Sequence, residues 1–370
     1  MSLTRLEIVG IRNIHQATLE LNPAINLIYG RNGSGKTSIL ESVYLLGAGR
    51  SYRNLSIEPL ISRHQDECLV RGHITTGTTQ HTIGVLRRRG GEREIRVDGK
   101  DVRRATDLAS RLPTLVVGPE AINLLLGPPA VRRRFLNWGL FHVEPSFTGI
   151  WEDANRCLRQ RNELLRRNAS ADELDTWTRE LVRHSEQLDE IRADYARNYE
   201  KVFLEHCGQL TDLADISCRY YRGWSHATAL QEIYEKDEEN DRKRGYTQRG
   251  FQRADVRISV AGEEVIGACS RGELKIISWT MMISQGAMLG GAAASNLVYL
   301  VDDLGSELDR QHRERICAYL MSTGRQVLAT GIERDRLVEF WKEKDIKLFH
   351  VEQGSVKECS MEQEENTSGG

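Results

Sequence analysis

The sequence predicts an α/β fold in which a P-loop nucleotide-binding head with mixed sheets carries an inserted helical lobe. First, a complete glycine-rich motif at 30–37 stands between an apolar strand and an amphipathic helix. Second, the continuous apolar run 297–301 ends in two acidic residues. Third, residues from about 130 to 210 place apolar side chains at helical spacing. The two nucleotide-binding segments therefore enclose the helical stretch.

The composition fits a cytoplasmic globular protein. The chain has 370 residues and 39% hydrophobic residues, enough for one large domain and a second lobe. Lys and Arg (51) nearly balance Asp and Glu (53), so a DNA site must come from local clusters. The seven scattered cysteines form no CxxC pair, which predicts reduced thiols. No apolar run approaches the ~20 residues that span a bilayer, and we expect no membrane partner.

The first part of the chain reads mainly as strands. We expect strands at 3–9 and 17–29, followed by a helix from Lys36 to near Gly47. Three short runs between 68 and 98, separated by Gly- and Thr-rich turns, predict a β-meander. A buried strand at 115–117 completes this part.

The domain organisation follows from a change in composition. We expect a discontinuous head at 1–129 and 246–352 and an inserted lobe of two or three long helices at 130–245. The charged, Gly-punctuated segment 236–257 is expected to be a long loop leading back to the head. The polar tail 353–370 is expected to be disordered.

The glycine-rich motif is the strongest signal in the sequence. Its glycines let several backbone N–H groups point into one concavity, and the following helix adds its positive dipole end. We expect Lys36 to contact the β- and γ-phosphates of ATP and Thr37 to ligate Mg²⁺. A chance Gly-rich turn is the alternative, but strand, motif and helix stand in register. The expected nucleotide-binding residues are Gly30, Arg31, Asn32, Gly33, Ser34, Gly35, Lys36, Thr37 and Ser38.

Two acids follow the apolar run 297–301. Asp302 is expected to hold Mg²⁺, and Asp303 stands where ABC-type ATPases place the catalytic carboxylate that orients or deprotonates the attacking water. An Asp reaches one methylene less than the usual Glu, so we expect slow hydrolysis. The alternative is an ordinary turn with a helix N-cap. Because most of the chain separates Lys36 from Asp302, the fold must accept a large insertion, as ABC and SMC heads do.

A segment before the acids resembles the ABC signature, usually S-G-G-Q. Ser270, Gly272 and Glu273 lie at the start of an expected helix, where a hydroxyl and backbone N–H groups can meet a γ-phosphate. In ABC-type subunits this helix reaches only the ATP of a partner, so the resemblance implies an ATP-sandwiched homodimer. The alternative is a simple capping box. Residues 306–309 resemble the D-loop, and Thr330 stands where transporters often carry a switch His.

With these motifs in this order, the chain resembles the RecF family over roughly residues 1–350. The resemblance implies an ABC-type ATPase head without a long coiled coil, with ATP and Mg²⁺ as cofactors. It also implies binding to DNA at single-strand/double-strand boundaries of gaps, ATP-dependent dimerisation, and work with RecO and RecR to load recombinase. Glu273 departs from the usual Gln of the signature. The blocks that carry the resemblance are 11–14, 49–53, 119–120, 127–129, 132–136, 241–247, 253–255 and 301–309.

Basic clusters are the candidate DNA contacts. Acids are interleaved throughout, so for any single cluster a solvated face is the favoured interpretation, but the resemblance leads us to expect that at least one cluster lines a DNA groove. The clusters lie at 87–89, 103–104, 132–134, 166–167 and 242–244. Two other functions stay open. A transporter ATPase subunit would usually carry a switch His. A monomeric P-loop nucleotide hydrolase or small-molecule kinase would show no ATP-dependent dimerisation.

Overall fold

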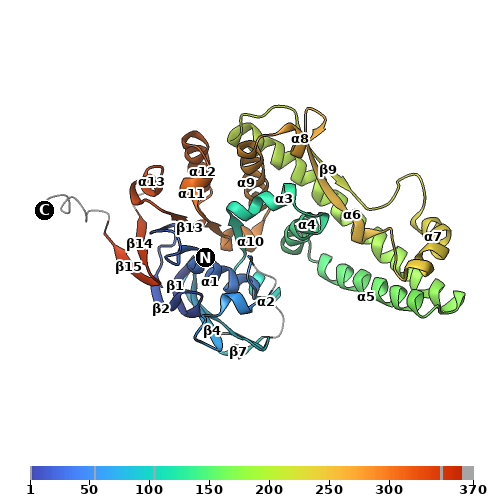
Figure 1. Ribbon diagram of the computed structural model, residues 1–370, viewed down its shortest axis with the longest axis horizontal. Helices are drawn as coiled ribbons and strands as arrows, with labels where there is room; N and C mark the ends of the chain where they lie inside the picture. The colour runs from blue at the N-terminus through green and yellow to red at the C-terminus, as the bar shows by residue number, and fades with distance from the viewer. Residues whose placement is uncertain (1, 54–55, 103–105, 342–344, 361–370) are drawn as a thin grey trace. The chain divides into compact units, whose positions relative to one another are not determined.

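The computed structural model describes residues 2–53, 56–102, 106–341 and 345–360 of the chain (Figure 1). It divides into two compact units. The first comprises Met1–Ala121, Lys275–Gly286 and Gly290–Gly370, and the second comprises Ile122–Leu274 and Ala287–Leu289. The boundaries of these units differ from those of the predicted segments, because residues 122–129 and 246–274 belong with the helical unit and not with the head.

The first unit contains an antiparallel sheet whose six described strands have the order β2-β1-β4-β5-β6-β7. Buried and exposed positions alternate along β1 and β4, as expected of strands with one face on the core. The predicted β-meander over 68–98 is confirmed by β4 to β6. The strands are β1 Ser2–Ile11, β2 Ile14–Glu20, β4 Glu67–Thr76, β5 Thr79–Arg88, β6 Arg93–Val97 and β7 Lys100–Asp101.

A second sheet of the first unit has the described order β15-β14-β3-β13-β12-β8. All neighbours pair in parallel except β14 and β15, and β13 lies between β3 and β12. The carboxyl ends of these parallel strands therefore meet at one edge, where α/β sheets bind ligands. The strands are β3 Ile25–Tyr29, β8 Thr114–Val117, β12 Val298–Val301, β13 Gln326–Gly331, β14 Ile346–Glu352 and β15 Ser355–Cys359.

The prediction of a single strand at 17–29 is wrong, because a turn separates β2 from β3. The side chain of Asn26 accepts a hydrogen bond from Asn22 N (2.7 Å) and donates one to Asn22 O (2.8 Å). The Asn22 side chain in turn accepts from Ala24 N (2.7 Å). These bonds satisfy the backbone of a turn at Asn22 and Pro23, so the two strands enter different sheets.

Helix α1 (Lys36–Ala48) contacts strands of both sheets and confirms the helix expected from Lys36 to near Gly47. Its buried side chains Ile39, Leu40, Val43 and Leu46 join one hydrophobic core with residues of both sheets. Shorter helices complete the unit. They are α2 Thr106–Ala109, α10 Gly291–Asn296, α11 Leu304–Glu307, α12 Arg310–Ser322 and α13 Arg334–Val338, with 3₁₀ turns at Glu58–Leu60 and Pro119–Ile122.

The prediction that the chain is disordered from residue 353 onward is wrong for its first residues, which form a turn and strand β15. Strand β15 pairs antiparallel with β14, with Val351 opposite Val356. Gln353 (φ 48°) and Gly354 (φ 81°) form the two-residue turn, and two consecutive positive φ values suit a tight hairpin. Residues 361–370 lie outside the described part of the chain.

The second unit confirms the prediction of two or three long helices. The 40-residue α6 contacts α5 along one side and strand β9 of a small antiparallel sheet, order β11-β10-β9. The elements are α3 Asn123–Leu126, α4 Pro129–Val143, α5 Phe147–Arg166, α6 Ala171–Leu210, β9 Ile216–Tyr221, α7 Leu230–Arg244, a 3₁₀ turn Phe251–Arg253, β10 Asp255–Val260, β11 Glu263–Glu264, α8 Val265–Ala268 and the start of α9 Arg271–Ala287.

The long loop expected at 236–257 is wrong, because its first part is helix α7 and its end is strand β10. Helix α7 has little apolar surface beyond its first turn. Two of the pairs that support it are the ion pairs of Arg242 with Glu238 and of Lys243 with Glu239, both four residues apart. Gly245, in the left-handed conformation, caps its end.

Two expectations from composition concern the whole chain. None of the helices in the described residues combines the length and apolarity that crossing a bilayer requires. All seven cysteines are free thiols, as expected.

Candidate nucleotide-binding site

The glycine-rich loop joins β3 to α1 at the carboxyl edge of the parallel sheet. Gly30 (φ 153°), Gly33 (φ 77°) and Gly35 (φ 122°) adopt conformations that L side chains rarely adopt. A Cβ atom on Gly30 would lie 2.2 Å from the carbonyl oxygen of Val351 on β14. Backbone conformation therefore favours glycine at all three positions, and lack of space requires it at Gly30 as well.

Lys36 folds back over this loop. Its Nζ donates hydrogen bonds to Gly30 O (2.7 Å) and Arg31 O (3.0 Å). Burial lowers the pKa of Lys36, and the carboxylates of Asp303 and Asp302 oppose that shift. The structure thus brings the ammonium group of α1 close to the two acids that follow β12.

Asn13 and the β14–β15 hairpin brace the loop from outside. The Asn13 side chain donates to Gly33 O (3.0 Å) and Ser34 O (2.8 Å), and it accepts from Ser38 Oγ (3.3 Å). Gly354 N also donates to Ser34 O (2.8 Å). Motif analysis missed both supports. The family-like block at 11–14 pointed to Asn13, whereas no signal in the tail pointed to Gly354.

Asp302 lies at the centre of a hydrogen-bond network. Its Oδ1 accepts from Thr37 Oγ1 (3.1 Å) and from Thr330 Oγ1 (2.8 Å), and its Oδ2 accepts from Tyr52 OH (3.4 Å). Burial raises the pKa of Asp302, and the bonds from Thr330 and Thr37 oppose the rise. The structure therefore joins the ends of β3, β12 and β13 at one carboxylate.

Asp303 has a constrained backbone. It adopts the left-handed conformation (φ 55°), and its N–H donates to Thr330 Oγ1 (2.8 Å). Its Oδ2 accepts from the Ser306 hydroxyl. One Thr330 hydroxyl thus donates to Asp302 and accepts from Asp303, which fixes the two acids relative to each other.

Two buried polar atoms of the site have no hydrogen-bond partner among the described residues. They are Ser34 Oγ in the loop and Asp303 Oδ1. Buried polar atoms are almost always satisfied, so orphaned ones in a loop of this type point to an absent polar ligand.

A buried ion pair anchors the segment after α1. Glu41 is fully buried on α1, and Arg12 donates to both of its oxygens, at 2.6 and 3.1 Å. The Ser51 hydroxyl also donates to Glu41, and Arg53 N donates to Ser51 Oγ (3.1 Å). This network holds the segment that carries Tyr52, whose hydroxyl donates to Asp302.

The signature-like segment belongs to the second unit at the start of α9. Ser270 N donates to Glu273 Oε2 (2.7 Å), and Glu273 N donates to Ser270 Oγ (3.3 Å). This is the reciprocal geometry of a capping box, and it lowers the pKa of Glu273. Ser270 and Gly272 are exposed, and a Cβ on Gly272 would meet only Ser270 Oγ, at 4.0 Å. Contact with a partner's nucleotide stays a prediction.

The D-loop-like segment 306–309 leads into α12. Asp309 is the N-cap of that helix and accepts from His312 N (3.0 Å), which lowers the pKa of the carboxyl. Glu307 forms an ion pair with Lys275 (2.9 Å). The segment is thus held at both ends by local interactions within the first unit.

Most arginines of the basic clusters are engaged within the protein. Arg88 pairs with Glu67, Glu92 and Glu94. Seven more side chains of these clusters bond to carboxylates or carbonyl oxygens, while Arg103 and Arg104 lie outside the described residues. The engaged side chains are Arg89, Arg132, Arg133, Arg166, Arg167, Arg242 and Lys243.

The sequence is similar to known proteins along nearly its whole length. A profile of the RecF/RecN/SMC N terminal domain matches residues 2–357. DNA replication and repair protein RecF of Pseudomonas paraeruginosa is 40% identical over 367 residues, which cover 97% of this chain and 98% of the relative. RecF of Pseudomonas putida strain F1 is 42% identical over 361 residues, covering 96% and 98%.

Solved structures share the fold. A recombination mediator RecF–ATP structure of the RecFOR pathway matches with a TM-score of 0.85 at 21% identity, covering 97% of this chain and 98% of that chain. The Smc head domain of Pyrococcus furiosus matches with a TM-score of 0.59 at 14% identity, covering 97% and 96%. The predicted fold class, an ABC-type ATPase head of the RecF and SMC type with an inserted helical lobe, is confirmed.

Proposed function

The chain belongs to the RecF family of DNA replication and repair proteins, and on that premise we propose that it is a DNA clamp switched by ATP. Two copies would close around two ATP molecules and shape a surface for DNA at single-strand/double-strand boundaries of gaps. The observation that carries this proposal is the hydrogen bond between Thr37 and Asp302. It joins two motifs from opposite ends of the chain at the edge where such sheets bind nucleotides.

ATP binding uses the glycine-rich loop. Lys36 now bonds to two carbonyl oxygens of its own loop, and in the proposed state it turns to the β- and γ-phosphates. The N–H groups of the loop and of the first turn of α1 receive the remaining phosphate oxygens. A phosphate group in the loop would also offer acceptors to the unsatisfied Ser34 hydroxyl.

Mg²⁺ fits the residues at the edge of the sheet. Thr37 and Asp302 offer a hydroxyl and a carboxylate oxygen 3.1 Å apart, and oxygen ligands of this kind suit Mg²⁺. When bound, the ion would neutralise charge on the phosphate oxygens. Thr330 would hold the Asp302 carboxylate in place for this role.

Asp303 is the proposed catalytic residue for ATP hydrolysis. Its carboxylate would orient or deprotonate the attacking water, and its backbone is fixed by Thr330. Because an Asp side chain is one methylene shorter than Glu, hydrolysis is slow and serves to reopen the clamp. The protein is in this view a weak ATPase.

The second half of each composite site comes from the partner copy. Ser270 and Gly272 are exposed at the start of α9, where a hydroxyl and N–H groups can meet a γ-phosphate. In this role the Ser270 hydroxyl, whose side chain bonds to Glu273 within the same copy, would turn to the γ-phosphate of the partner's nucleotide. Glu273 adds a negative charge that opposes dimerisation.

The partners follow from the family. DNA with single- and double-stranded parts is the proposed substrate surface, and mediators of the RecO and RecR type are the proposed protein partners. Family membership disfavours a transporter ATPase subunit and a monomeric nucleotide hydrolase.

Fluorescence anisotropy with labelled gapped DNA tests the proposal. The wild-type chain should bind more tightly with ATP than without it, while Lys36→Ala should lose the ATP-dependent part. Lys36→Ala removes the ammonium group that would contact phosphate, together with its bonds to Gly30 O and Arg31 O. Equal binding with and without ATP for the wild-type chain would contradict the clamp.

A further inference from the structure

We infer that the open face of the β9–β10–β11 sheet is a binding surface for single-stranded DNA. This surface, called the arginine face below, is formed by Ser217, Arg219, Tyr221, Arg257 and Ser259. The inference rests on the proposed DNA-binding function and assigns a new contact to it.

The arginine face is the side of the sheet turned away from helix α6. Side chains alternate along β9 and β10. Cys218, Val256 and Ile258 are buried on the side that faces the core of the second unit. Arg219 and Arg257, at the alternate positions, are exposed. The sheet thus has one buried and one open side.

Two arginines stand directly opposite each other on this side. The register pairs Arg219 of β9 with Arg257 of β10, and like charges in that position destabilise a sheet. Within the described parts of the chain, neither guanidinium has an ion pair. This differs from the basic clusters of the sequence, most of whose members are engaged. An uncompensated pair that backbone register holds at the surface would be stabilised by an anion from outside.

The nearest carboxylates do not neutralise this pair. Asp255 is opposite Tyr221, but both of its oxygens accept from Arg132 of α4, at 2.7 and 3.0 Å. Glu264 is opposite Ser259, and Asp215 precedes β9, so both lie at the end of the face away from Tyr221. The positive charge therefore concentrates beside the aromatic ring.

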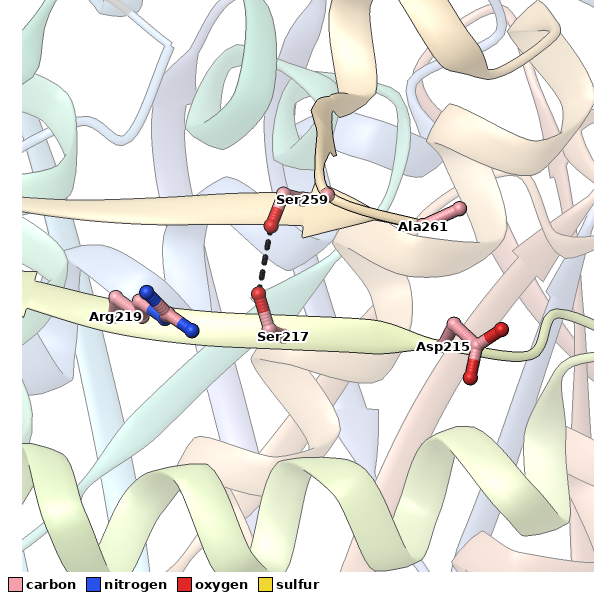
Figure 2. Close-up of a pocket in the computed structure, with 6 residues that line it drawn as sticks. Asp215, Ser217, Arg219, Ser259 and Ala261 are labelled. Atoms are coloured by element: carbon pink, nitrogen blue, oxygen red, sulfur yellow. Dashed lines mark hydrogen bonds between the residues drawn. The ribbon is translucent and has the colours of Figure 1, made fainter.

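Hydroxyl groups and a hollow continue the surface. Figure 2 shows Ser217 and Ser259 joined across the strands by a hydrogen bond of 2.6 Å. Whichever hydroxyl donates, the other keeps its hydrogen for an outside acceptor. The hollow here has a volume of about 540 Å³ and is lined by Asp215, Ser217, Arg219, Ser259, Ala261 and Gly262.

Tyr221 identifies the kind of nucleic acid. The residue is 40% exposed, and the Arg257 guanidinium lies 5.3 Å from its ring centroid. Unpaired bases stack on tyrosine rings and on guanidinium planes, while bases within a duplex are not available for stacking. Phosphates would meet Arg219 and the serine hydroxyls. The combination fits a single strand.

The test measures binding of the full chain to an oligonucleotide of about 16 nucleotides, the upper end of usual site sizes. The double variant Arg219→Ala/Arg257→Ala should bind about tenfold more weakly. The slope of log K against log salt should fall in magnitude by about 0.7, since the variant removes one phosphate contact, that of Arg219, and each such contact contributes about 0.7. Because the variant removes a repulsive pair, its melting temperature should not fall.

The matched control is Arg179→Ala/Arg197→Ala. These two arginines are exposed on α6 of the same unit and form ion pairs with Asp175 and Asp194. The control makes the same change in net charge and should leave the slope unchanged. An equal loss in both double variants would overturn the inference, because it would reduce the effect to overall charge.

Tyr221→Ala separates single-stranded from double-stranded DNA. It should weaken binding of the single strand about tenfold and leave a duplex of the same length unaffected. Equal loss for both would overturn the assignment to a single strand. If the arginine variant binds like the wild type while Lys36→Ala loses its ATP-dependent DNA binding, this inference fails and the proposed clamp stands. If the wild-type chain binds no DNA, both fail.

Discussion

Thr330 holds the two acids of the site through a single hydroxyl group. It donates to Asp302 Oδ1 at 2.8 Å and accepts from Asp303 N at 2.8 Å. From the sequence, Thr330 was noted only because it stands where transporters often carry a switch His. Its bonds to the two acids could not be predicted, because a contact between neighbouring strands does not show in the spacing of residues along the chain. The glycine-rich loop, by contrast, could be predicted completely, since all of its residues are contiguous.

The Thr330 bridge makes a prediction for turnover. Thr330→Val should lower kcat for ATP hydrolysis about tenfold to a hundredfold, because Asp303 loses the acceptor that fixes its backbone. Thr330→Ser keeps the hydroxyl and should stay within about threefold of the wild type. Steady-state ATPase assays with nucleotide affinity measured in parallel give the result. Loss of nucleotide binding with unchanged kcat in Thr330→Val would contradict a positioning role for hydrolysis.

Asp302 makes a prediction for stability against pH. Burial raises the pKa of Asp302 in the folded state, so the ionised carboxylate destabilises the nucleotide-free protein at neutral pH. That cost disappears as the pH falls through the folded-state pKa toward the unfolded value, where the group is protonated in both states. Asp302→Asn should therefore melt at a higher temperature than the wild type at neutral pH, and the difference should shrink in acid.

The neutral amide can accept the bonds from Thr37 and Thr330 at its oxygen, and its NH₂ group can donate to the Tyr52 oxygen, so Asp302→Asn keeps the network with the Tyr52 bond reversed. Thermal melts in the absence of nucleotide and metal, at a series of pH values, check the prediction. A difference in melting temperature that is independent of pH would show that titration of Asp302 is not its cause.

At the scale of elements, the sequence predicts those whose apolar residues follow a period. Helix α1 and the β-meander carry such patterns, and both were predicted. Helix α7 was missed because its charged part has no apolar stripe. It is anchored instead by buried Asp241, which forms an ion pair with buried Arg161 at 2.8 Å. Two features of the sequence could have predicted this helix: the opposite charges four residues apart, and Gly245 at its end.

Strand β15 was missed for a related reason. Its residues are polar, with Val356 as its main apolar contact, and a polar tail is ordinarily read as disorder. The strand is stabilised by pairing with β14. This pairing is visible only in the three-dimensional structure of the sheet. Its turn then reaches the glycine-rich loop through Gly354.

The start of helix α9 makes a prediction at this scale. Glu273→Gln keeps an oxygen that can accept from Ser270 N, so the capping box should persist and the free energy of unfolding should change by less than about 0.5 kcal/mol. Removing the negative charge should strengthen ATP-dependent dimerisation, by about tenfold in the dissociation constant. Sedimentation with ATP and chemical denaturation measure the two effects.

Glu273→Ala is the control for the charge. It should also favour the dimer but lose stability, because it removes the reciprocal bond of the capping box. Weaker dimerisation of Glu273→Gln would contradict a position of this side chain near a partner's triphosphate.

For the whole molecule, family, fold class and helical lobe could be predicted, whereas the surface chemistry could not. Runs of arginine in the sequence suggested DNA contacts, yet most of these side chains are engaged inside the protein. The arginine face instead pairs Arg219 with Arg257, which are far apart in the chain. Strand register brings them together, and register cannot be deduced from residue counts alone.

The central claim at this scale is that each ATP is bound by two copies of the chain. Lys36→Ala destroys one half of each composite site, and Ser270→Arg destroys the other half. Ser270→Arg should still bind ATP, because its own glycine-rich loop is intact. Neither variant alone should dimerise with ATP.

Mixing the two variants tests the claim most directly, with mass measured by sedimentation or light scattering in the presence of ATP. One site of a mixed dimer combines both defects, while the other combines an intact loop with an intact signature segment. An ATP-dependent dimer should therefore reappear in the mixture although each variant alone stays monomeric. A mixture that remains monomeric, or a Ser270→Arg variant that dimerises by itself, would contradict the account.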